Sequence, residues 1–252
     1  MFVSGDFQVG LFDFFKAKSG EPAKKGGSAS KWADRAADKR AQTYERTEAL
    51  QALADLGTAD AAEALLRRFT FAIDPSISDQ EEKELAFRGI LNAGRDAIDS
   101  IRAFAAKADS LAWPMKLLRS MLNEDEYVTE LLEWLSRWDT EYAKFIDPKL
   151  QLLGAFEEHK DPRIVDRVAP FLEDVSEQSR FTAASALLAQ GDPRVAELLM
   201  PLLLDDESVR IRARIADGFM KARWQVPEDA RDRLALTLPS LYRVSASGTV
   251  ER

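Results

Sequence analysis

DPRIVDRVAPFLED (residues 161–174) and DPRVAELLMPLLLD (residues 192–205) are two copies of one pattern, separated by a constant offset of 31 residues. The Asp-Pro-Arg start, the internal proline and the final aspartate all recur. Apolar residues recur at the same offset, so that Ile164 corresponds to Val195 and Val168 to Leu199. A repeat that extends to apolar positions predicts one helical unit that is used more than once, as in a solenoid.

The polar residues of the pattern have a structural reason. Asp161 and Asp192 are placed to cap a helix, because an aspartate side chain accepts hydrogen bonds from the backbone N–H groups that a helix start leaves unpaired. Proline at the first helical position has a preset φ and no N–H to leave unpaired, so the turn is sharp. Pro170 and Pro201 fall later in the same helices, and each removes a backbone hydrogen bond. We therefore expect both helices to kink at equivalent points.

Helical segments are predicted from Trp32 onward. Apolar residues recur with helical spacing in runs of about 12 to 18 residues, which are separated by turns containing Gly, Asp-Pro or Asn. We predict six antiparallel helix pairs, whose first helices cover residues 34–56, 79–93, 111–122, 141–158, 176–190 and 207–223. A single pair cannot bury its apolar face, whereas stacked pairs bury a continuous core. The predicted fold class is all-α, an α-solenoid over residues 32–240.

The most regular part of the chain resembles a known family. SRFTAASALLAQGDPRVAELLMPLLLDDESVRIRARIADGF (residues 179–219) is similar to the bacterial HEAT-like repeats that were first named after phycobilisome lyases. The resemblance is clear over residues 161–223, moderate over residues 41–72 and weak over residues 78–145. It implies a solenoid of HEAT-like helix pairs and no particular activity.

Composition narrows the possible classes of protein. The 252 residues are 46% hydrophobic, which is ample for a buried core, and they include no cysteine. Disulfides, thiolate metal sites and cysteine nucleophiles are therefore absent, and a cytoplasmic protein is expected. No apolar run approaches the roughly 20 residues that cross a bilayer. The net charge of -8 argues against general affinity for nucleic acid.

The sequence also lacks the residue patterns of the enzymes that use this fold. The chain has one histidine, His159, which follows Glu157 and Glu158 at a predicted helix end, where a side chain near the last carbonyl groups is the simplest interpretation. Deoxyhypusine hydroxylase resembles the chain in repeat type but requires paired His-Glu motifs for two irons. The bilin lyases would imply a chromophore, and no residue marks a site for one. We therefore expect no enzymatic activity, no metal and no cofactor.

Basic residues on the predicted second helices indicate where a partner would bind. Second helices at 58–72, 161–173 and 192–205 would line the concave face of the solenoid. The arginines on these helices or at their starts are Arg67, Arg68, Arg163, Arg167 and Arg194, and a C-terminal basic patch is predicted from Arg210, Arg214 and Lys221. Guanidinium groups favour interfaces with carboxylates. We expect a non-enzymatic scaffold or adaptor that binds a protein, in particular an acidic one.

One alternative function comes from a different class. Alkylpurine DNA glycosylases are similar solenoids that grip damaged DNA with a basic face, tryptophan side chains and a carboxylate. The closest local match is Trp134, Trp138 and Asp139. Tryptophans four residues apart share one face of a helix, and such aromatic pairs belong more often to a core than to a binding surface. A nucleic-acid-binding or DNA-repair solenoid is therefore the alternative, and it predicts steeply salt-dependent binding.

The two ends of the chain differ from the repeats. Residues 1–31 are predicted to be a flexible segment with one short apolar cluster. The candidates for docking to a protein, in the same chain or another, are Leu11, Phe12, Phe14 and Phe15. Residues 9–16 are too short for firm membrane insertion and would give only weak peripheral contact. Residues 241–252 lack helical spacing, so an extended tail is expected.

Overall fold

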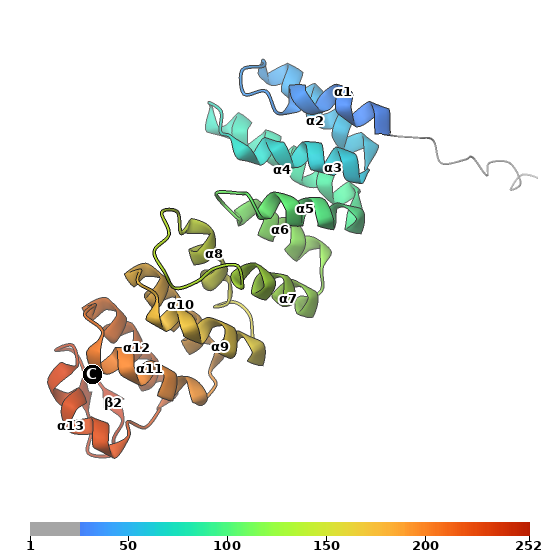
Figure 1. Ribbon diagram of the computed structural model, residues 1–252. Helices are drawn as coiled ribbons and strands as arrows, with labels where there is room; N and C mark the ends of the chain where they lie inside the picture. Colours follow the sequence, from blue (N-terminus) through green and yellow to red (C-terminus); the bar gives the residue numbers. More distant parts are fainter. Residues whose placement is uncertain (1–25) are drawn as a thin grey trace, which may run out of the picture.

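The helices stack in chain order along one axis (Figure 1). The structure is a computed structural model, and it describes residues 26–252. The α-helices are α1 (Gly26–Ala36), α2 (Thr43–Leu56), α3 (Ala59–Leu66), α4 (Ser76–Asn92), α5 (Ile98–Ala105), α6 (Ala112–Met121), α7 (Glu124–Leu135), α8 (Asp147–Ala155), α9 (Pro162–Val168), α10 (Glu177–Gln190), α11 (Arg194–Asp205), α12 (Val209–Ala222) and α13 (Glu228–Thr237). Short 3-10 helices are η2 (Arg67–Thr70), η3 (Gly94–Ala97) and η4 (Ala169–Glu173).

The predicted all-α solenoid is confirmed. Six helix pairs, from α2/α3 to α12/α13, follow one another in the described part of the chain. First helices pack on first helices, as α2 does on α4 and α10 on α12, and second helices pack on second helices, as α3 does on α5 and α7 on α9. The result is two parallel rows of helices. None of the helices within residues 26–252 is both long and apolar enough to span a membrane.

The folded part begins earlier than we expected. Residues 26–31 were assigned to the flexible segment because of their Gly and Ser content, and they form the start of α1 instead. Ala29 is buried, Trp32 packs against the core, and α1 contacts both α2 and α3. The predicted helix 34–56 is therefore divided into α1 and α2. Burial of these apolar side chains offsets the entropy cost of ordering the glycines and serines.

The two prolines inside the repeated pattern do not act in the same way. Helix α9 ends just before Pro170 and continues as the 3-10 helix η4. Pro201 lies inside α11, which remains one α-helix. A missing N–H can be accommodated by a tighter turn or within the α-helix, and the surrounding packing selects between these outcomes. The two prolines are therefore accommodated in different ways, and the kinks at equivalent points stay a prediction.

Glycine fixes the spacing of neighbouring first helices in a continuous core. The buried apolar residues of all the pairs form one cluster that is rich in alanine and leucine. A Cβ atom on Gly89 of α4 would lie 2.7 Å from the side chains of Ala54 and Leu65. A Cβ atom on Gly218 of α12 would lie 2.2 Å from Leu188 on α10. At Gly89 the helices approach too closely for any larger residue, and at Gly218 a larger residue would have to displace the Leu188 side chain.

The C-terminal residues form a hairpin, which corrects our expectation of an extended tail. Strands β1 (Arg243–Val244) and β2 (Val250–Glu251) pair antiparallel, and Gly248 adopts a φ of 86° in the turn between them. Val250 is buried, and Arg252 donates to Asp217 on α12 at 2.7 Å. The hairpin contacts α12 and α13 and so covers the end of the solenoid. Helical spacing does not reveal it, because each strand is only two residues long.

Candidate partner-binding surface

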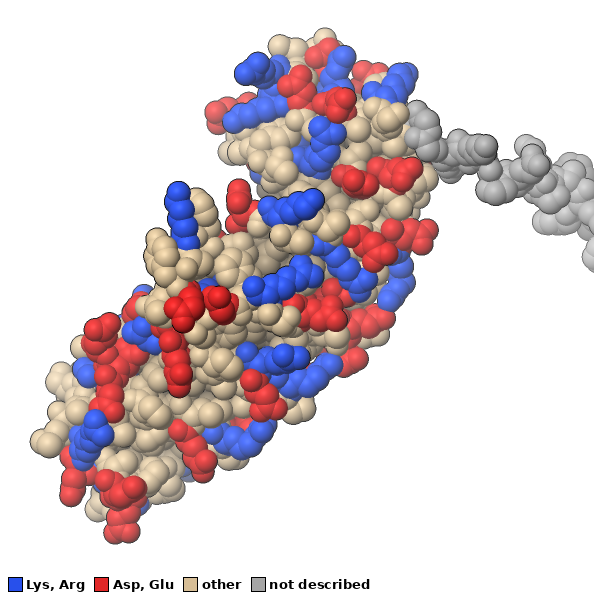
Figure 2. Space-filling view, viewed as in Figure 1, with Lys and Arg blue, Asp and Glu red and all other residues tan. Residues whose placement is uncertain are grey.

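A row of ion pairs connects the helix pairs to one another. Figure 2 shows acidic and basic side chains interleaved along the length of the molecule. Among the ion pairs, those made across to a neighbouring pair by arginines in the row of second helices and their adjoining 3-10 helices are Arg67–Asp34, Arg95–Glu126, Arg102–Glu130, Arg163–Asp125, Arg194–Asp166 and Arg233–Asp205. Each of these arginines already has a carboxylate of its own chain. Much of the positive charge on the second helices is therefore neutralised within the molecule.

Arg163 and Arg194 show how the repeated Asp-Pro-Arg motif works. The Asp161 carboxylate accepts from the backbone N–H of Arg163 at 2.9 Å, as expected of a cap, and the Arg163 guanidinium folds back onto the same carboxylate at 2.6 Å. The guanidinium also donates to Asp125 on α7 at 2.7 Å. The side-chain hydrogen bond lowers the pKa of Asp161 and raises the pKa of Arg163. Arg194 makes the same two contacts with Asp192, from its backbone N–H at 2.9 Å and from its guanidinium at 2.8 Å.

Arg68 was expected at the partner-binding surface, and the structure places it in the core. Its side chain is fully buried, and its guanidinium donates to Glu82 at 2.7 Å and to Asp79 at 2.8 Å. Arg46, which is also buried, donates to Glu82 at 2.9 Å. Burial would raise the pKa of Asp79, but hydrogen bonds from Lys83 and Arg68 lower it overall. Arg68 cannot contact a partner, because it joins η2 to α4.

The predicted C-terminal basic patch is divided. Arg210 lies over the ring of Phe181 at 3.9 Å, and Arg214 donates to a serine hydroxyl at 2.9 Å, so both side chains are held against α10. Lys221 is exposed. Arg167 is also exposed, beside a groove of about 380 Å³ between α7 and α9. Neither Arg167 nor Lys221 makes an ion pair within residues 26–252, so both remain free for a ligand.

An aromatic groove of about 690 Å³ lies between α3, α5 and the start of α6. Its aromatic side chains, Phe69, Phe104 and Trp113, are half-buried. The rings of Phe69 and Trp113 are stacked, with 4.7 Å between their centroids. Sequence patterns missed this site, because its three rings come from three different helical segments. A concave site with accessible aromatic surface is the usual setting for an anchor residue of a binding partner.

Charged side chains surround the aromatic groove. Glu63, Asp99 and Asp109 contribute carboxylates, and Arg67 and Lys107 contribute cations. Arg67 already pairs with a carboxylate of α1, whereas Lys107 makes no ion pair in the described part of the chain. A ligand for this groove would therefore combine an apolar side chain with polar or charged neighbours.

His159 connects two helix pairs. It is buried, and its Nδ1 is hydrogen-bonded to the Glu124 carboxylate at the start of α7. The hydrogen bonds with His159 and, to a smaller extent, with Arg119 lower the pKa of Glu124. The ring of Tyr127 packs against the His159 ring, and burial raises the pKa of Tyr127 to about 12. We expected this side chain near the last carbonyl groups of its own helix, and it contacts the preceding pair instead. Residues 26–252 contain no group of three His, Asp or Glu side chains placed to hold a metal ion.

The two tryptophans that suggested DNA repair do not share a helix face. Trp134 is buried in the core on α7, as the core interpretation predicted. Trp138 follows the end of α7, so it lies in the connection to α8. Asp139, next to it, is exposed, and its backbone carbonyl accepts from Lys149. The predicted docking residues of the N-terminal cluster, within residues 11–15, lie outside the described residues.

Comparison with known proteins agrees with this architecture. Residues 128–218 match the family model of HEAT repeats. No curated protein and no solved structure matches the chain. The matched region contains the repeated pattern of residues 161–205 and the helices on either side of it. The described chain is an all-α solenoid of the HEAT-like kind, and its residues 128–218 are similar to HEAT repeats.

Proposed function

We propose that this chain is a non-enzymatic scaffold that holds a protein partner, with the aromatic groove as a main point of contact. HEAT repeats are commonly protein-interaction scaffolds. The observation that carries the proposal is that Phe69, Phe104 and Trp113 leave ring surface accessible in one concave site. Burying an apolar side chain of a partner against such rings is where interfaces gain most of their free energy.

The partner that fits best is a protein segment with an apolar anchor and charged neighbours of both signs. The anchor would lie between Phe104 and Trp113, with a basic neighbour near Glu63 and Asp109 and an acidic one near Lys107. Arg167 and Lys221 are further candidate contacts because they are exposed and make no ion pair within residues 26–252. The predicted contacts that would first have to leave an intramolecular partner are Arg67, Arg163, Arg194, Arg210 and Arg214. We therefore give these five a smaller part in binding.

Photo-crosslinking in the source cells tests the proposal. A photoreactive phenylalanine analogue at Ala103, which is exposed in the groove wall, would report on the groove. The same analogue at Gln51, which is exposed on α2 in the row of first helices, is the matched control. We expect a discrete cross-linked protein from position 103, absent from position 51 and reduced by Lys107→Glu. Equal labelling from both positions, or no effect of Lys107→Glu, would contradict the proposal.

We do not extend the proposal to nucleic acid. Trp134 is buried on α7, whereas Arg210 and Arg214 are held against α10, so the tryptophans and the C-terminal arginines do not form one basic surface. Duplex DNA added to the purified chain provides the test. Tight binding that weakens steeply with salt would favour the nucleic-acid alternative over the protein scaffold.

A further inference from the structure

A second groove lies on the other side of the loop 106–110 from the aromatic groove. Its volume is about 340 Å³, and it is bounded by the end of α5, the start of α8 and the segment that follows α7. Trp134, Trp138 and Phe145 provide aromatic walls, and Leu111 provides an aliphatic one. We call this site the tryptophan groove. The inference drawn from it does not rest on the proposed function.

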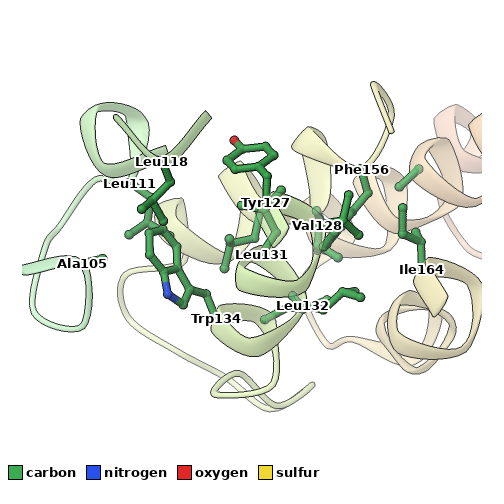
Figure 3. Packing of buried hydrophobic residues seen from close by; sticks show 14 of the residues in the cluster. Ala105, Leu111, Leu118, Tyr127, Val128, Leu131, Leu132, Trp134, Phe156 and Ile164 are labelled. Carbon is green, nitrogen blue, oxygen red and sulfur yellow. The ribbon is translucent and has the colours of Figure 1, made fainter. Parts of the chain in front are cut away.

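One hydrogen-bond donor in the tryptophan groove has no acceptor. Trp134 is 3% exposed, and its indole N–H has no hydrogen-bond partner among the described residues. Figure 3 shows the indole nitrogen on the side of Ala105, which also lines the groove. A buried donor without a partner lowers the stability of the fold, and an acceptor that entered the groove and displaced the atoms covering the indole N–H would remove this penalty.

The edge of the groove carries two free cations. Lys107 and Arg137 are exposed, and neither makes an ion pair within residues 26–252. Asp109 contributes a carboxylate to the same lining, so the cations outnumber the anions there. Phe145 is 69% exposed, which leaves most of its ring uncovered. The occupant that fits this lining is apolar, carries a carboxylate and offers a hydrogen-bond acceptor.

We propose that the N-terminal segment Leu11-Phe12-Asp13-Phe14-Phe15 of the same chain occupies the tryptophan groove. This segment places four large apolar side chains around one carboxylate. Its phenyl rings would pack against Trp138 and Phe145. The Asp13 carboxylate would pair with Arg137 at the edge of the groove, and a backbone carbonyl of the segment would accept from the indole N–H of Trp134.

The length of the intervening chain allows this contact. Residues 16–25 separate the segment from Gly26, the first residue of α1, and can span at most about 36 Å when fully extended. Helix α1 packs on α3, and α3 packs on α5. Neighbouring helix axes lie about 8–10 Å apart, so these two steps place α5 about 16–20 Å from α1. Arg67 at the end of α3 pairs with Asp34 near the end of α1, so the end of α5 lies opposite Gly26 and the length of α1, about 16 Å, is added at right angles. The end of α5 is therefore about 25 Å from Gly26. The linker can therefore deliver the segment to the groove.

Nuclear magnetic resonance of the indole N–H groups tests the proposal on the full chain. Isotope-labelled tryptophan gives one indole signal for each of the five tryptophans, and Trp134→Phe identifies the signal of that residue. One variant carries Asp13→Asn, and a second, fourfold variant has serine in place of the four apolar residues of the segment. Both variants change residues outside the described fold, and an unchanged helical circular dichroism spectrum checks that the solenoid is intact. A synthetic peptide of residues 9–16 is then added to the fourfold variant.

We expect the Trp134 signal to move upfield in the fourfold variant, because its hydrogen bond is lost, and to return when the peptide is added. Asp13→Asn should produce part of the same movement, and the signal of Trp224 near the C-terminus should stay in place. Arg137→Glu, introduced into the fourfold variant, should weaken peptide binding about tenfold. Lys160→Glu, which changes an exposed cation in the connection between α8 and α9 outside this groove, is the matched control and should have no effect.

Two results would overturn the proposal. The first is a Trp134 signal that is identical in the parent chain and the fourfold variant, since this would show that the segment does not reach the groove. The second is a signal that moves with protein concentration in the parent chain, since this would place the segment of a neighbouring copy in the groove instead of the chain's own.

Discussion

Replacing Lys149 with methionine should lower the free energy of unfolding by about 3–5 kcal/mol. Lys149 on α8 and Asp174 are both fully buried, with 2.7 Å between Nζ and Oδ2. Unit charges at this separation attract by roughly 6 kcal/mol at an effective dielectric constant of about 20, and desolvation of both groups offsets part of that. Methionine preserves most of the side-chain volume, so the main loss is the charge partner of Asp174, which would stay buried and uncompensated.

Urea unfolding followed by circular dichroism measures this coupling in the parent chain, Lys149→Met, Asp174→Asn and the double variant. Each single variant should lose about 3–5 kcal/mol, whereas the double variant should recover much of that loss because no buried charge remains. Asparagine can still accept from the backbone N–H of Ser176, which Asp174 caps at 2.8 Å. Losses that simply add, or a loss below about 1 kcal/mol for Lys149→Met, would refute the conclusion that the two charges are desolvated and coupled.

Three further predictions concern packing, pH and the hairpin. Gly218→Ala should cost about 1–3 kcal/mol, because its Cβ would lie 2.2 Å from a leucine of α10. Gly154 lies inside α8, and its Cβ would meet only one methyl group, at 3.8 Å, so Gly154→Ala should instead stabilise the chain by about 0.5–1 kcal/mol. Thermal unfolding compares the two variants. Arg163→Ala should lower the free energy of unfolding only slightly at neutral pH, because its side chain is 41% exposed. The hydrogen bond from Arg163 lowers the pKa of Asp161 in the folded chain, so the stabilisation is present above the ordinary value of 3.8 and is lost as the pH falls below it. If the parent chain and Arg163→Ala still differed by the same amount in urea unfolding at the lower pH, this prediction would be contradicted. Val250→Asp should release the hairpin, because it places a carboxylate in a buried position, and faster trypsin cleavage there with unchanged helical circular dichroism would show it.

Local chemistry was enough to predict the class of fold and most helix boundaries. The first helix expected at 176–190 is α10, and Asp161 caps α9 through the expected backbone hydrogen bond. Such features depend on residues within one or two turns of the chain, so apolar spacing and capping residues reveal them directly. The repeat at 161–205 also predicted that helix pairs stack on one another, because an amphipathic pair needs a neighbour to cover its apolar face.

Tertiary structure alone decided which side chains meet. Arg68 and Arg163 look alike in the sequence, yet Arg68 is buried between two carboxylates, whereas Arg163 lies at the surface and reaches Asp125, 38 positions away. The aromatic groove and the unpaired indole N–H of Trp134 likewise arise only where separate helix pairs come together. These contacts depend on the spacing and angle between neighbouring pairs. Those quantities are set by how buried side chains of different pairs interlock, and no pattern within a single helix contains them.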